Sequence, residues 1–180
     1  RGVEIRVQGA RFHQVELERA FAADGRLSEE AVDLEFHHQT ASTTVTLRHG
    51  SWGPVEGGAI GVAGRHRELQ VGGDDAFTPG VREGALALFA FQEVPLGAGV
   101  RLQVGGRSEF QRSRALPNEA FPALDVSRRS HARSGSIGLH WRPAPAWEGG
   151  VQLARAHRNP TVEELHADGA HLGAGVYEVG

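Results

Sequence analysis

Apolar and polar residues alternate one by one along much of this chain, and a period of two restricts it to β-structure. In residues 101–111, Leu102, Val104 and Phe110 fall on one side, with charged or polar residues on the other. Successive strand residues point to opposite faces of a sheet, so this segment predicts a strand with one apolar and one polar face. A helix would spread the same charges around its whole circumference.

Six further segments repeat the alternation, and the chain therefore predicts about seven antiparallel strands of about ten residues each. These segments are residues 3–7, 41–47, 60–62, 86–89, 137–141 and 151–153. In the segment 86–89 the alternate positions are apolar as well, so this strand is expected to be apolar on both faces.

The expected connections alternate in length. Residues 50–55, 94–99 and 143–146 are short and rich in Gly and Pro, as tight turns require. The long, charged connections are residues 18–35, 71–82, 113–133 and 158–180. This order is typical of outer-membrane barrels, which have short periplasmic turns and long extracellular loops. The three tryptophans, Trp52, Trp141 and Trp147, lie at or beside the short turns, where an aromatic girdle is expected.

The fold class we expect is all-β, an antiparallel up-and-down transmembrane β-barrel segment. Only 39% of the residues are hydrophobic and no segment has the ~18 apolar residues of a membrane helix, but a barrel strand needs apolar residues only at every second position. A formal net charge of −3 gives no reason to expect a nucleic-acid partner. No spacing predicts a nucleophile, a phosphate loop or paired catalytic carboxylates, so we do not expect an enzyme.

The stretch at residues 158–180, RNPTVEELHADGAHLGAGVYEVG, follows the last expected strand. It contains in order Arg-x-Pro-Thr, Glu-Glu-Leu, Gly-x-His, a small-residue run and an aromatic-Glu-x-Gly close. In this order of residues the chain resembles the segment that ends a late barrel strand in TonB-dependent outer-membrane receptors.

The resemblance implies that residues 1–180 are part of the receptor's barrel domain, about a third of a barrel of about 22 strands. The plug domain, the TonB box and the C-terminal part of the barrel would then lie outside this sequence. The implied location is the outer membrane of a Gram-negative bacterium, and the implied function is energy-coupled uptake of a scarce ligand. The implied partners are the receptor's own plug domain, a TonB-type energy-coupling protein and outer-membrane lipid.

Histidines and carboxylates in the expected loops are candidate metal ligands, because imidazole and carboxylate groups bind Zn²⁺. Some receptors with this terminal pattern import zinc, so zinc or a metal chelate would be transported cargo, with no resident cofactor. The candidate ligands are His166, His171, Glu163, Glu164, Asp168, His37 and His38. The alternative is that they are ordinary polar loop residues, with Thr161 and Glu164 forming a helix capping box.

Two other functions remain open, a passive porin-type barrel and a soluble β-rich binding module. A soluble module would bury residues such as Leu102, Val104, Ile137 and Leu139. The charges expected on the polar face would either contact a plug or form a solvated surface. They are Arg48, Arg65, Arg67, Arg101, Arg107 and Glu109.

Overall fold

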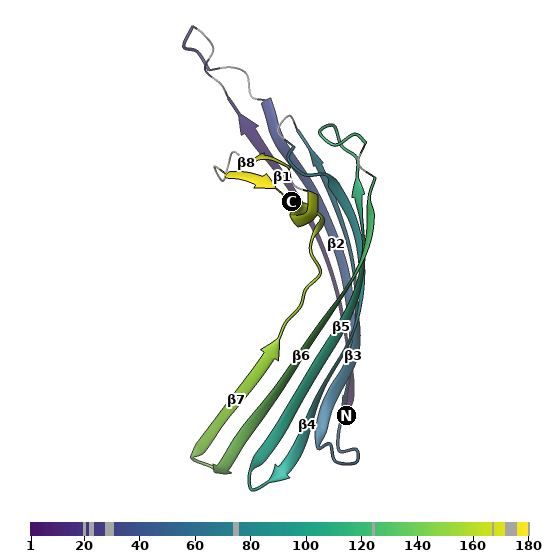
Figure 1. Ribbon diagram of the computed structural model, residues 1–180, viewed down its shortest axis with the longest axis vertical. Coiled ribbons are helices and arrows are strands. Elements are labelled where there is room, and N and C mark those ends of the chain that lie inside the picture. Colours follow the sequence, from purple (N-terminus) through teal and green to yellow (C-terminus); the bar gives the residue numbers. More distant parts are fainter. Residues whose placement is uncertain are drawn as a thin grey trace.

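The computed structural model describes residues 1–19, 21, 24–27, 31–73, 76–123, 125–166, 168–171 and 176–179. Seven strands form one antiparallel sheet in chain order (Figure 1), which confirms the expected all-β, up-and-down architecture. They are β1 (Gly2–Glu18), β2 (Ala31–His49), β3 (Gly57–Gly72), β4 (Gly80–Gly97), β5 (Val100–Leu116), β6 (Ser127–Ala144) and β7 (Trp147–Arg155). Within the described part of the chain the sheet is open, with β1 and β7 at its edges.

The sheet is curved, and the chain after β7 returns to its concave side (Figure 1). This returning segment contains the short helix α1 (Val162–His166) and a hairpin of β8 (Asp168–His171) and β9 (Val176–Val179). Of the described helical residues, none belongs to a helix long and apolar enough to cross a membrane.

The strands are longer than the sequence pattern predicted. Strands β1 to β6 contain 16 to 19 residues instead of about ten, and the long connections shrink to residues 19–30, 73–79 and 117–126. Beyond the apolar stretch the pairing is supported by polar contacts, since Arg82 lies 3.1 Å from Glu68 on β3. Opposite charges paired across strands stabilise a sheet as apolar pairs do. The predicted alternation of short and long connections holds only in part, because the expected short connection 50–56 and the expected long connection 73–79 each contain seven residues.

Apolar side chains are exposed on the convex face of the sheet. Of the four residues that a soluble sheet would bury, Val104, Ile137 and Leu139 are 42%, 52% and 44% exposed, and Leu102 is half-buried. Register places them in one band across all seven strands. Its other large members are Val3, Ile5, Val7, Val45, Leu47, Ile60, Val62, Leu86, Leu88, Val151 and Leu153.

Three polar side chains in the middle of the concave face are covered instead. Glu83, Gln111 and Ser113 are 2%, 5% and 4% exposed, although all three are polar or charged. The polarity of this sheet is therefore the reverse of that in a soluble protein, where polar residues are mostly exposed and apolar ones buried.

A small apolar core closes the long-loop end of the concave face. Its members are Leu34, Leu69, Val71, Ala76, Phe77, Val81 and Ala115. The Asn118 side chain ties the loops to it, because its amide donates to the carbonyls of Val71 at 3.1 Å and Thr78 at 2.9 Å. Its oxygen accepts from the backbone N–H of Phe121 at 2.8 Å. Residues 76–78 and 118–121 at this end are thus packed and hydrogen-bonded.

The sequence predicted apolar residues at the alternate positions of β4. Phe89 is the largest of them, and it lies over Gly61 on β3. Gly61 pairs with Phe89 across β3 and β4. A Cβ at Gly61 would lie 2.4 Å from the Phe89 ring and 2.5 Å from the carbonyl oxygen of Val45. Glycine is therefore required here because a ring and a backbone approach from two neighbouring strands.

Candidate functional site: the concave polar groove

The concave polar groove is a depression of about 680 Å³ on strands β2 to β5, next to residues 158–161. Its volume is in the range of pockets that hold small ligands. The side chains that line it are mostly polar and include His38, Arg65, Arg67, Glu83 and Gln111.

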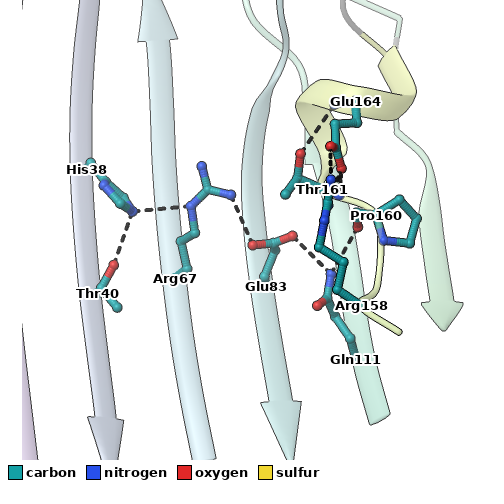
Figure 2. Close-up of polar contacts among 9 residues, drawn as sticks. All are labelled: His38, Thr40, Arg67, Glu83, Gln111, Arg158, Pro160, Thr161 and Glu164. Carbon is teal, nitrogen blue, oxygen red and sulfur yellow. Dashed lines mark hydrogen bonds and ion pairs between the residues drawn. The ribbon is translucent and has the colours of Figure 1, made fainter. Parts of the chain in front are cut away.

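A chain of hydrogen bonds crosses four strands in the groove (Figure 2). Arg67 donates from Nε to His38 at 3.2 Å and from Nη1 to Glu83 at 3.1 Å. Gln111 donates to the other oxygen of Glu83 at 3.1 Å and to the carbonyl of Pro160 at 3.4 Å. The returning segment is thus joined to the sheet through a continuous polar network.

The network determines the hydrogen-bonding state of His38. Because Arg67 always donates, His38 Nε2 is an acceptor, and the Thr40 hydroxyl at 3.0 Å donates to the same atom. In this arrangement Nε2 carries no proton. A metal ion could reach Nε2 only by displacing Arg67 and Thr40.

Glu83 and Arg67 form an ion pair with little access to water. Their side chains are 3% and 17% exposed. Such a pair needs further hydrogen bonds to offset its loss of hydration. Here Gln111 supplies one to Glu83 and His38 accepts one from Arg67.

Thr161 and Glu164 form the expected capping box at the start of α1. Glu164 accepts from the Thr161 backbone N–H at 3.0 Å, and the Thr161 hydroxyl accepts from the Glu164 N–H at 3.3 Å. Arg158 also contacts both oxygens of Glu164. These donors, Arg158 first, lower the pKa of Glu164 from 4.5 to about 2. This carboxylate is therefore engaged in shaping the loop.

Two hydrogen-bond donors in the groove, Asn159 and Arg65, lack an acceptor or an acidic partner among the described residues. Asn159 is 8% exposed, and its buried Nδ2 has no hydrogen-bond acceptor among the described residues. No ion pair of Arg65 is found in the described part of the chain, and its side chain is exposed at the groove. A buried N–H without an acceptor is costly. The groove therefore suits an occupant that offers oxygen acceptors.

The other charges predicted on the polar face are mostly paired with nearby carboxylates. Arg101 lies 3.0 Å from Glu56, Arg48 lies 3.5 Å from Glu4, and Arg107 contacts Glu109. These pairs are exposed and contribute little stability.

The seven candidate metal ligands are not gathered at one place. His37 and His38 are neighbours in β2, so His37 faces the convex side and His38 the groove. His166 is half-buried. Its pKa is lowered mainly by this burial and further by the positive charge of Arg128. The backbones of Glu163, Asp168 and His171 lie in α1 and β8, and their side chains lie outside the described residues.

A different group of possible ligands occurs on the convex face of β1 and β2. Glu35 Oε1 lies 2.8 Å from His13 Nε2 and 2.9 Å from His37 Nε2, and the two imidazole rings stack at 4.1 Å. Two histidines and one carboxylate are a donor set that Zn²⁺ accepts. The sequence candidates included His37 but not His13 or Glu35, because only the strand register brings the three together.

Comparison with known proteins adds no family assignment. The chain matches no protein-family model and no curated protein.

Proposed function

We propose that this chain forms part of the wall and external loops of a TonB-dependent outer-membrane receptor that takes up a scarce ligand, such as zinc or a metal chelate. The observation that carries the proposal is the reversed polarity of the sheet, with an apolar convex face and a polar concave face. An outer-membrane barrel has this arrangement, with lipid outside and a polar interior.

The continuity of the apolar band supports a lipid surface. One row of cross-strand neighbours reads Ile5, Val45, Val62 and Leu88, and another reads Val104, Ile137 and Leu153. A contiguous apolar surface of this extent is rare on a soluble monomer. In the proposed barrel the same surface contacts acyl chains.

The contents of the groove support a plugged barrel over an open one. Residues 158–161 lie against the concave face, and Asn159 and Arg65 offer donors there. A plug domain with backbone carbonyls, or an incoming ligand with oxygen atoms, would satisfy them. The uptake activity itself rests on the resemblance of residues 158–180 to the receptor family.

The proposal is tested by comparing the growth of a strain that lacks the gene with growth of the same strain carrying the full-length gene. We expect slower growth under zinc or metal-chelate limitation, restored by the full-length gene, with the protein in the outer-membrane fraction. Normal growth of the deletion strain under each limitation would contradict the metal cargo. Recovery of the full-length protein in the aqueous fraction would contradict the membrane wall.

A passive porin-type barrel would share the apolar band, so energy dependence separates the two. Dissipating the proton-motive force should stop uptake of the ligand by the receptor. Uptake that continues unchanged would favour the porin.

A further inference from the structure

Five arginines gather on the convex face of β4, β5 and β6, where the apolar band ends toward the long loops. This arginine cluster consists of Arg82, Arg112, Arg114, Arg129 and Arg133. All five are exposed. Arg112 lies directly opposite Arg129 across β5 and β6, and Arg82 lies directly opposite Arg114 across β4 and β5.

The cluster has more positive charge than the surrounding acids neutralise. Arg82 pairs with Glu68, and Arg114 pairs with Asp125 at 2.8 Å. In the described part of the chain no carboxylate pairs with Arg112 or Arg129. Like charges directly opposite each other destabilise a sheet, so this position favours an external anion.

The cluster adjoins the apolar band without a gap. The cross-strand row next to Arg112 and Arg129 contains Leu86, Phe110 and His131. The Phe110 and His131 rings stack with their centres 4.1 Å apart. A molecule with acyl chains along the band would place its headgroup at the arginines.

The other half of the same margin differs in chemistry. On β1 and β2 it has His13, Glu35 and His37, which bind one another. Arg11 on β1 and Arg155 on β7 also point to the convex side. In the described sheet, however, arginines lie directly opposite one another only on β4, β5 and β6. These opposed arginines indicate a specific site.

We propose that Arg112 and Arg129, assisted by the neighbouring arginines, bind the phosphate headgroup of an anionic lipid whose acyl chains lie along the apolar band. This inference rests on the proposed membrane location. Guanidinium groups suit the site because each offers a planar pair of N–H donors that matches two phosphate oxygens.

The test uses the full-length protein in mixed micelles that contain phosphatidic acid and phosphatidylcholine with identical acyl chains. Native mass spectrometry then counts the lipids that remain bound. We expect the wild-type protein to retain phosphatidic acid several-fold over phosphatidylcholine. The double variant Arg112→Gln/Arg129→Gln should lose most of that preference. The matched control Arg48→Gln/Arg101→Gln removes two arginines from the concave face near the short turns and should keep it.

Two further measurements make the result independent of folding defects. The variant Arg112→Lys/Arg129→Lys keeps the charge without the planar fork and should retain an intermediate preference. For the wild-type protein, salt at about 1 M, where the Debye length is about 3 Å, should weaken the preference.

Equal retention of both lipids by a membrane-embedded wild-type protein would overturn this inference and leave the proposed function intact. An unchanged preference in Arg112→Gln/Arg129→Gln would also overturn it. A protein that does not enter lipid at all would contradict the proposed function as well.

Discussion

Arg67 on β3 donates to Glu83 on β4 across 3.1 Å, and the Glu83 side chain is only 3% exposed. Replacing Arg67 with Met leaves a buried carboxylate with Gln111 as its remaining hydrogen-bond donor. Removing one partner of a buried pair costs about 3 kcal/mol. We therefore expect Arg67→Met to lower the free energy of unfolding by about that amount, measured by denaturant titration of the full-length protein in lipid vesicles.

The double variant Arg67→Met/Glu83→Leu should recover most of the loss, because it removes both charges. Arg82→Met breaks the more exposed pair with Glu68 and is the matched control, with a cost within about 1 kcal/mol. A double variant that loses the sum of both single effects would show that the pair is not coupled.

Gly61 provides a second test, because the Phe89 ring and the Val45 carbonyl leave no room for a side chain at this position. We expect Gly61→Ala to lower the free energy of unfolding by about 1–3 kcal/mol through overpacking. Gly64→Ala on the same strand is the control, because its Cβ would meet nothing within 4 Å. Equal stability of the two variants, measured by the same titration, would refute the packing argument.

The faces of the sheet could be predicted from the sequence, because side-chain alternation is a local property of a strand. The strand ends could not. Residues near Arg82 and Arg114 are as polar as loop sequence, and only partners on other segments, Glu68 and Asp125, support their pairing.

The local contacts of the candidate site could likewise be predicted from the sequence, whereas its long-range contacts could not. The capping box of Thr161 and Glu164 is a contact within three residues and was predicted from their spacing. The contact between Gln111 and Pro160 joins residues 49 positions apart, and no local pattern indicates it. The separation of His37 and His38 follows from strand geometry once β2 is known to include both.

Glu164 predicts a defined pH dependence for the returning segment. Its pKa in the folded protein, about 2, is below the ordinary 4.5, so its stabilising contribution is complete above pH 4.5. That contribution is lost as the pH falls from 4.5 toward 2. We expect Glu164→Gln to speed hydrogen exchange of the Thr161 amide relative to the wild type above pH 4.5, and the two rates to converge near pH 2.

Asp125→Asn is the control for this measurement. The pKa of Asp125 is also lowered, by the hydrogen bond from Arg114, but Asp125 lies in the connection between β5 and β6. Exchange at Thr161 should therefore be unchanged in this variant. If Glu164→Gln and the wild type exchange alike at neutral pH, the capping box does not hold the segment.

Ile137 distinguishes a lipid-facing wall from a sheet in water. Its side chain is 52% exposed on the convex face, between Val104 and Leu153 on the neighbouring strands. In lipid, Ile137→Arg should lower the free energy of unfolding by about 2–4 kcal/mol, because an arginine near the middle of the bilayer loses its hydration. At an exposed site in water the same substitution should change stability by no more than about 0.5 kcal/mol.

Ser136→Arg is the matched control, because Ser136 precedes Ile137 in β6 and points to the concave face. Denaturant titration of the full-length protein in vesicles should give a clearly larger loss for Ile137→Arg than for Ser136→Arg. Equal losses would mean that the convex face does not contact acyl chains, and the membrane proposal would fail. A larger loss for Ile137→Arg would instead locate the lipid on the face whose apolar residues the sheet leaves uncovered.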